Sequence, residues 1–166
     1  MIKKLGIFIF SSILLGACSV YSFTGASISP DAETVSIGYF QNNASMVQPT
    51  LSNSMTESLK DQFVSQTNLS LTDASGDLQF EGEITGYNVK PIAIQANETA
   101  AQNRLTITVK ITFTNTIDEK QNYSQSFSHY SDFDSSQDLS SIEIELIDQI
   151  VEVLSEKIFN KTFTNW

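Results

Sequence analysis

The chain of 166 residues fits one domain, since domains average roughly 150 residues. With 40% hydrophobic and 17% charged residues, it is too apolar for a disordered chain, and it lacks the long apolar runs of a polytopic membrane protein. Nine Lys and Arg against nineteen Asp and Glu give a net charge of −10, which argues against general binding to nucleic acid. A single His and a single Cys leave no His/Cys metal cluster, disulfide or thiol–imidazole pair, and so argue against most enzyme classes.

The N-terminus has the features of a secretory signal. Residues 1–4 are basic, and the apolar residues 5–15 are too few to cross a membrane as a helix, which takes about 20 residues. Small residues then precede the only cysteine, in the order Leu15-Gly16-Ala17-Cys18. This order resembles the lipobox of bacterial lipoproteins, in which the thiol is diacylated and the preceding peptide is removed. The alternative is an ordinary signal peptide with a chance cysteine near its cleavage site.

The lipobox resemblance implies a signal peptide over residues 1–17, a lipidated Cys18 and a tether over residues 18–33. Two or three acyl chains make a stable anchor, and their attachment consumes a thiol that would otherwise meet an oxidising compartment. Removal of the two N-terminal lysines leaves seven cations against nineteen acids, a formal charge of −12. Ser19 stands where some lipoproteins carry the Asp of inner-membrane retention, so we expect anchoring at the periplasmic face of the outer membrane. No cofactor is expected beyond the covalent lipid on Cys18.

The mature chain begins with a strand and a helix. Residues 34–40 alternate apolar and polar side chains, as a half-buried strand does, and residues 41–43 break this pattern. A helical pattern opens at Pro49, and Ser54 with Glu57 has the spacing of a capping box. Its apolar positions form a narrow stripe: Leu51, Met55, Leu59, Phe63 and Val64. We expect this helix to cover one face of a sheet.

A short strand over residues 69–71 precedes a long one over residues 78–91. The alternation of the long strand changes at Gly86, which predicts a β-bulge, and Gly82 likewise predicts a bulge or a close approach of another segment. The apolar positions fall on two parities: Leu78, Phe80 and Ile84, then Tyr87 and Val89. The polar residues 92–103 predict an exposed loop.

The clearest strand spans residues 105–114, where apolar residues alternate with four threonines and one lysine. The apolar set is Leu105, Ile107, Val109, Ile111 and Phe113. One face is therefore core, and the other is a threonine-rich face that is either wet or covered by a partner. Residues 118–120 predict a turn, and residues 123–130 return as the second strand of a hairpin.

A final helix begins in the polar residues 135–141, where Ser140 and Glu143 have capping-box spacing. Its apolar stripe is wider than that of the first helix: Ile142, Leu146, Ile150, Val153, Leu154 and Ile158, with Ile144, Ile147, Val151 and Phe159 beside them. The element order β-α-β-β-β-β-α predicts an α+β fold in one domain over residues 34–166. We expect a mostly antiparallel or mixed sheet of about four to five strands with two helices packed on one face.

Few residues indicate chemistry. His129 lies in a predicted strand without any sequence pattern of nucleophile and base, so a histidine on the sheet surface is the favoured interpretation. Residues 132–138 carry carboxylates spaced as at the start of a calcium loop, with Glu143 at the twelfth position but Gln137 in place of the turn glycine. We expect these carboxylates to solvate a loop and to favour the start of the final helix. No catalytic residue and no metal site is predicted.

Lys90, Arg104 and Lys110 are three of the seven cations of the mature chain, which makes them candidate contacts for lipid phosphate or partner carboxylates. Lys110 projects from the threonine-rich face, and Arg104 begins the same strand. The alternative is a strand edge that charge protects from aggregation. Four aromatic residues are candidate anchors for a partner, with burial in the core as the default: Phe23, Tyr39, Phe40 and Trp166.

Several stretches resemble the lipopolysaccharide-assembly lipoprotein family, LptE, in its short forms. They follow the lipobox and cover nearly the whole mature chain: residues 20–25, 34–40, 49–63, 77–87 and 103–114, and the C-terminal helix. The resemblance implies a lipid-anchored outer-membrane protein that occupies the lumen of a large β-barrel partner, LptD. It also implies a non-enzymatic role in lipopolysaccharide transport, with contact to the lipopolysaccharide through basic residues.

The residues themselves are compatible with this role, because a threonine-rich sheet face suits the polar interior of a barrel. Two alternatives belong to other classes. One is a periplasm-facing envelope lipoprotein that binds peptidoglycan or another ligand. The other is a lipid-anchored hydrolase, which the missing nucleophile–base pattern disfavours.

Overall fold

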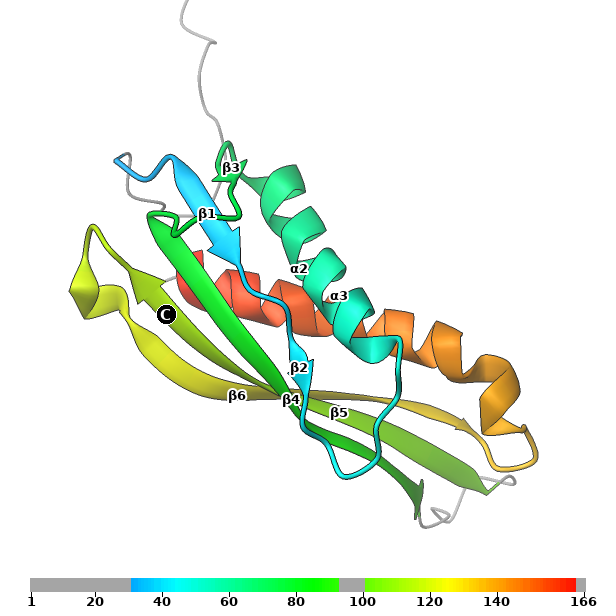
Figure 1. Ribbon diagram of the computed structural model, residues 1–166. Helices are drawn as coiled ribbons and strands as arrows, with labels where there is room; N and C mark the ends of the chain where they lie inside the picture. The colour runs from blue at the N-terminus through cyan, green and yellow to red at the C-terminus, as the bar shows by residue number, and fades with distance from the viewer. Residues whose placement is uncertain (1–30, 93–100, 164–166) are drawn as a thin grey trace, which may run out of the picture.

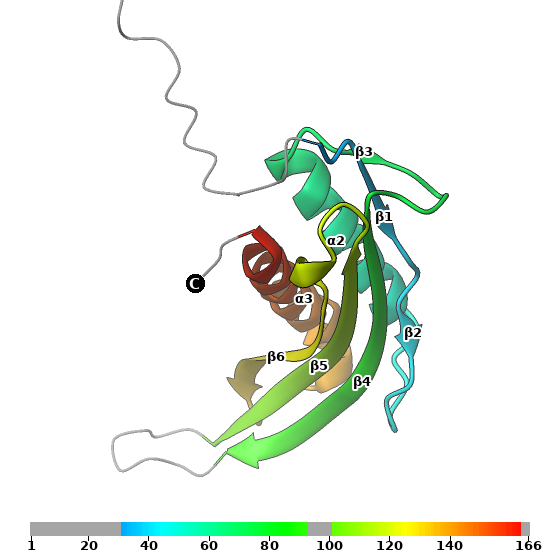
Figure 2. The same cartoon turned by 90° about the vertical axis from the view of Figure 1, so that its left-hand side faces the viewer.

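The computed structural model describes residues 31–92 and 101–163. These residues form a six-stranded mixed sheet covered by two helices, and Figures 1 and 2 show the sheet curving around them. The elements in chain order are β1 (Thr34–Ile37), β2 (Gln41–Asn42), α2 (Leu51–Gln66), β3 (Ser70–Leu71), β4 (Leu78–Ile92), β5 (Gln102–Asn115), the short 3₁₀ helix η2 (Glu119–Gln121), β6 (Tyr123–Asp134) and α3 (Leu139–Phe163). The predicted α+β class and the two-helix layer are confirmed.

The sheet has an antiparallel half and a parallel half. Strands β4, β5 and β6 form an antiparallel meander, while β1 runs parallel to both β3 and β4. The strand order is β3-β1-β4-β5-β6, and β2 pairs with β4 in parallel beside this path. Strand β2 coincides with the residues expected to break the first strand, so that expectation is wrong. A two-residue strand is too short to show a period in the sequence.

The alternation of β5 is confirmed as the centre of the core. Its five apolar side chains are at most 1% exposed: Leu105, Ile107, Val109, Ile111 and Phe113. In β4, the register shifts between Ile84 and Gly86, so the predicted bulge is present. Because the bulge adds one residue, Ile84 and Tyr87 both reach the core despite their different parity, at 0% and 1% exposure.

Gly82 marks a close approach rather than a second bulge. The ring of Phe40 lies on it, and a Cβ at Gly82 would be 2.3 Å from Cε1 of Phe40. The backbone N–H of Phe40 donates to Oγ1 of the buried Thr56 at 3.1 Å, which fixes this segment against α2. Phe40 therefore belongs to the core.

The N-terminus of α2 differs from its prediction. The helix begins at Leu51 after Thr50, so Ser54 lies inside the helix and does not cap it. Instead, Oε1 of Gln48 accepts hydrogen bonds from the backbone N–H groups of Thr50 and Leu51 at 2.6 and 3.1 Å. Glu57 forms an ion pair with Lys60 instead of a capping box. The apolar stripe is otherwise confirmed, except that Val64 is 55% exposed.

Asp138, not Ser140, satisfies the first turn of α3. Its carboxylate accepts from the backbone N–H of Ser140 at 3.2 Å and from the Ser140 hydroxyl at 2.8 Å. Glu143 accepts a hydrogen bond from the hydroxyl of Tyr87 at 2.5 Å, which joins α3 to β4. Burial, and then Glu143, raise the pKa of Tyr87 above its ordinary value. Ile144 is 67% exposed and does not widen the buried stripe.

Asp77 fixes the start of β1, and its titration should appear in acid unfolding. Its Oδ2 accepts from the N–H groups of Glu33 and Thr34 and from the Thr34 hydroxyl, at 2.7 to 3.0 Å. The Thr34 hydroxyl, followed by the two backbone donors, lowers the pKa of Asp77 from its usual 3.8. A carboxyl with a lowered folded-state pKa stabilises the fold above its unfolded pKa, and this contribution is lost as the pH falls through the folded value.

We therefore expect the stability difference between wild type and Asp77→Asn to be constant above about pH 5 and to shrink below about pH 4. Urea unfolding at a series of pH values measures it. A difference that stays the same down to pH 2.5 would contradict the assignment of the titrating group to Asp77.

Candidate functional site

The face of the sheet that points away from the helices is the candidate site, and we call it the outer sheet face. The pairing of β4, β5 and β6 places on it the residues that alternate with the core positions of these strands. They are mostly hydroxyl, amide and charged side chains: Glu81, Glu83, Asn88 and Lys90 from β4, Arg104, Thr106, Thr108, Lys110 and Thr112 from β5, and Ser124, Ser126, Ser128, Tyr130 and Asp132 from β6. Hydroxyl pairs cross the strands here, as between Thr108 and Ser128 at 3.1 Å.

All three candidate cations lie on the outer sheet face. Lys90 and Arg104 are direct cross-strand partners of β4 and β5, and Lys110 is the partner of Glu83. The described residues contain seven Lys and Arg, so nearly half of the positive charge lies on this face. The structure thus brings Lys90 beside Arg104, while Lys110 lies six residues further along β5.

Arg104 is held by neighbours on β6. Its Nε and Nη2 donate to the two carboxylate oxygens of Asp132 at 2.7 and 2.8 Å, and its guanidinium lies 3.5 Å from the ring centroid of Tyr130. The hydrogen bond to Asp132 raises the pKa of Arg104. A guanidinium neutralised in this way has less charge to offer an anionic ligand. Asp132 and Tyr130 were not among the predicted contacts, although a cross-strand register for the hairpin would have placed them beside Arg104.

Lys90 is the most available of the three cations. Lys110 lies 3.4 Å from Glu83, whose other oxygen accepts from Nδ2 of Asn43 at 3.0 Å. Lys90 is exposed, and no ion pair involves it within the described part of the chain. An anionic group that reaches this end of the sheet would therefore meet the Lys90 ammonium first.

Asp132 and Asp134, two of the carboxylates expected to solvate a loop, lie in a strand instead. Strand β6 continues to Asp134, four residues beyond the predicted end, so Asp132 faces Arg104 across the sheet. Asp134 accepts from the N–H of Ser136 at 2.8 Å, and its hydrogen bonds to Ser136 lower its pKa. Among the described residues, no group of three or more His, Cys, Asp and Glu side chains is placed to hold a metal ion.

His129 lies on the helix side of β6 rather than on the outer sheet face. Its Nδ1 is 3.3 Å from Nζ of Lys157 in α3, and it is half-buried. Burial, followed by the charge of Lys157, lowers the pKa of His129. The ring is therefore neutral at pH 7 and serves as an acceptor for the lysine.

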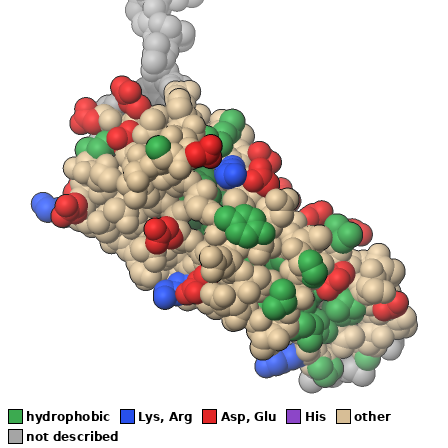
Figure 3. All heavy atoms as spheres, in the orientation of Figure 1, with side chains coloured by type: hydrophobic (Ala, Val, Ile, Leu, Met, Phe, Trp, Pro, Cys, Tyr) green, Lys and Arg blue, Asp and Glu red, His purple; other side chains and the backbone are tan. Residues whose placement is uncertain are grey.

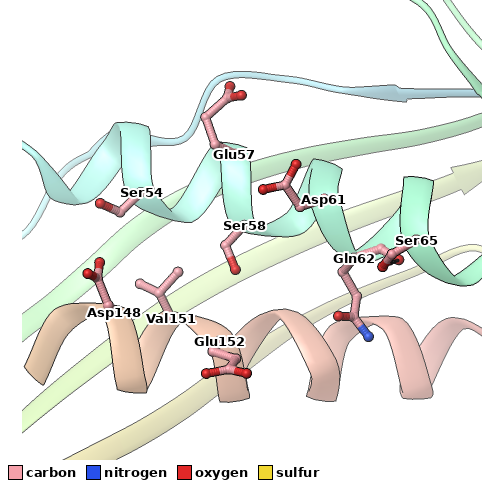
Figure 4. Close-up of a pocket in the computed structure, with 9 residues that line it drawn as sticks. All are labelled: Ser54, Glu57, Ser58, Asp61, Gln62, Ser65, Asp148, Val151 and Glu152. Carbon is pink, nitrogen blue, oxygen red and sulfur yellow. Dashed lines mark hydrogen bonds between the residues drawn. The ribbon is translucent and has the colours of Figure 1, made fainter. Parts of the chain in front are cut away.

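A shallow groove of about 440 Å³ separates the exposed sides of α2 and α3. Figure 4 shows Ser58 and Gln62 pointing from α2 toward α3, and Asp148 and Val151 pointing from α3 toward α2, while Glu57 points away. Four carboxylates line the groove, so it repels an anionic ligand: Glu57, Asp61, Asp148 and Glu152. This groove is therefore a poor site for an anionic ligand.

The aromatic candidates divide between core and surface. Tyr39 is 61% exposed, whereas Phe40 is fully buried, and Phe23 and Trp166 lie outside the described residues. Met46 and Val47, in the loop between β2 and α2, are also more than half exposed. Figure 3 shows that polar groups dominate the visible surface and that hydrophobic side chains gather mainly toward one end.

The predicted lipidation site lies outside the described residues, as do the signal peptide and most of the tether. No described helix combines the length and apolar character that crossing a membrane requires. Anchoring through Cys18 therefore stays a prediction.

Comparison with known proteins assigns the family. Residues 32–162 match the model of LptE, described as lipopolysaccharide-assembly. The chain belongs to the LptE family. Membership indicates a non-enzymatic lipopolysaccharide-assembly lipoprotein of the cell envelope, as the resemblance implied. The sequence matches no curated protein.

Solved structures share the LptE-like fold at low sequence identity. A minor lipoprotein from Acinetobacter baumannii is 12% identical with a TM-score of 0.51, over 78% of this chain and 91% of that one. A homologue of a neuraminyllactose-binding hemagglutinin from Helicobacter pylori is 11% identical with a TM-score of 0.51, over 86% and 89%. Protein XCC0632 from Xanthomonas campestris is 10% identical with a TM-score of 0.51, over 83% and 90%. These similarities concern the fold alone.

Proposed function

We propose that this protein is anchored by a lipid on Cys18 at the periplasmic face of the outer membrane and plugs a large β-barrel of the LptD type during lipopolysaccharide transport. The match to the LptE family over residues 32–162 carries this proposal. The protein acts as an assembly partner and not as a catalyst. Its ligands are the barrel and lipopolysaccharide.

The outer sheet face supports the barrel partnership. The interior of a large membrane barrel is polar, so a protein inside it needs a polar surface that exchanges hydrogen bonds with the wall. Rows of Thr and Ser on β5 and β6 supply such a surface, and the helices cover only the opposite face of the sheet. The acidic groove between α2 and α3 is less suited to contact with lipopolysaccharide phosphates.

Lys90 is the residue that we assign to the phosphates of lipopolysaccharide. Lys90→Glu is expected to weaken binding to purified lipopolysaccharide about five-fold or more, because an exposed charge contributes on the order of 1 kcal/mol. Lys120→Glu is the matched control, since Lys120 is exposed in η2, at the other end of β5. Binding isotherms at constant salt measure both variants. Equal weakening by the two substitutions would show a general charge effect and contradict the assignment.

The proposed function is tested by purifying the full-length, lipidated protein from its native envelope in detergent and identifying the retained proteins by mass. The expected result is a large β-barrel in stoichiometric amount. Depletion of the lipoprotein from cells should then reduce lipopolysaccharide at the cell surface. Recovery of the lipidated protein without a barrel would overturn the proposal. That result would favour an envelope lipoprotein that binds peptidoglycan or another ligand.

A further inference from the structure

Strand β6 ends the sheet, and one side of its backbone faces away from β5. The N–H of Ser135 donates to the carbonyl of Ala101 at 3.0 Å, which directs the odd-numbered residues of β6 toward β5. The carbonyl of Ser128 instead accepts from Nζ of Lys157 at 3.1 Å. Because backbone groups alternate in direction along an antiparallel strand, residues 124, 126, 128 and 130 present their N–H and C=O groups outward. We call these backbone groups the β6 edge.

The β6 edge lacks the charges that usually protect an exposed strand. Residues 123–131 contain no Asp, Glu, Lys or Arg, in a chain with a net charge of −10. Charges stand at the two ends, with Asp118, Glu119 and Lys120 before the strand and Asp132 and Asp134 at its finish. A long uncharged edge with outward N–H and C=O groups is a template for another strand. Within the described residues, only Lys157 donates to it.

Helix α3 excludes a second copy of this chain as the occupant. Hydrogen bonds tie it along the length of β6: Gln149 with Ser131, Lys157 with Ser128 and Thr162 with Tyr123. Adjacent strands lie about 4.8 Å apart, whereas packed helices need about 8–10 Å. Pairing two copies through β6 would therefore force their α3 helices together. A single extended segment without a helix above it fits the same edge.

We propose that the β6 edge binds an extended segment of the barrel partner by strand addition. This inference rests on the proposed function, and it names the part of the molecule that holds the partner. The wall of a closed barrel has no free strand edge, so the segment lies outside the wall strands. Its chemistry follows from β6: uncharged in the middle and basic beside Asp134, since Arg104 already neutralises Asp132. Lys157 leaves the Ser128 carbonyl when the segment binds.

Ser126→Pro tests the edge without breaking the sheet. The N–H of Ser126 faces outward, so proline removes a donor from the edge while the hydrogen bonds between β5 and β6 remain. We expect about ten-fold less barrel to be retained with lipidated Ser126→Pro in the detergent purification, from one lost hydrogen bond and the bulk of the ring. Ser126→Ala keeps the N–H and measures what the Ser126 hydroxyl contributes on the outer sheet face, so the proline variant should retain far less barrel than the alanine variant. Circular dichroism and thermal unfolding should show both variants folded.

The outcomes separate the two proposals. Absence of the barrel with the wild-type protein would overturn the proposed function, whereas equal retention by Ser126→Pro and Ser126→Ala would overturn the edge inference alone. If the proline variant does not fold, it is replaced by a photo-crosslinking side chain at the exposed position 125, which lies on the other face of β6 from the outer sheet face. A crosslink to an extended segment of the barrel protein supports the inference. A crosslink to a second copy, or none to the barrel, overturns it.

Discussion

Replacing Phe63 with alanine is expected to lower the free energy of unfolding by about 3–5 kcal/mol, the usual cost of removing a buried phenylalanine. Phe63 is fully buried where α2 meets β4 and α3. Its ring centroid lies 4.8 Å from Phe80, 5.3 Å from Phe159 and 5.5 Å from Phe163. One substitution therefore removes aromatic contacts to a strand and to the second helix at once. Urea denaturation measures the loss.

Val64→Ala is the control, because this neighbour lies on the same helix but is 55% exposed. Its effect should stay within about 0.5 kcal/mol. If Phe63→Ala cost no more than Val64→Ala, the aromatic junction would not hold the two helices to the sheet. The pair thus tests the packing of this layer independently of any partner.

The central strands could be predicted because their side chains alternate strictly. In β5, every second residue is apolar and buried, and the change of parity in β4 showed the bulge before Gly86. The parallel pairing of β1 and the short β2 could not be predicted in the same way. A parallel pair depends on which distant segments meet, and the two residues of β2 are too few to carry a period.

Helix ends were harder to predict because several side chains compete for the same donors. Ser54 and Ser140 have capping-box spacing, but Gln48 and Asp138 accept the bonds at the first turns. Spacing alone does not say which polar side chain reaches the free N–H groups. The exposure of Ile144 could not be predicted for a similar reason. The spacing of apolar residues along a helix does not show where the element that covers the helix ends.

The candidate site was predictable in its residues but not in its arrangement. Scarcity of positive charge singled out Lys90, Arg104 and Lys110 in the sequence. The three cations differ in how available they are to an anionic ligand because their cross-strand partners differ. Those partners depend on the register of the hairpin. Arg104 meets Asp132 only because Gln102 pairs with Asp134. Without that register, the sequence could not show that Arg104 is neutralised and that Lys90 has no such partner among the described residues.

The largest functional effect is expected from Cys18→Ser. Serine has no thiol for acylation, and each buried methylene of an acyl chain contributes about 0.8 kcal/mol to membrane binding, so its loss should release the protein from the membrane almost completely. Fractionation of the envelope and the mass of the purified protein measure this change. Under the proposed function, lipopolysaccharide at the cell surface should fall with it, because the barrel then lacks an anchored partner.

Ser19→Asp is the matched control for the destination of the protein. This substitution leaves Cys18 available for acylation, and by analogy with other lipoproteins it should move the anchored protein to the inner membrane. Retention of the acyl mass with loss from the outer membrane would separate lipidation from sorting. Membrane association of Cys18→Ser at the wild-type level would contradict lipid anchoring through this residue. The barrel would then be the remaining candidate for holding the protein at the membrane, and the β6 edge and the outer sheet face would carry the whole of that attachment.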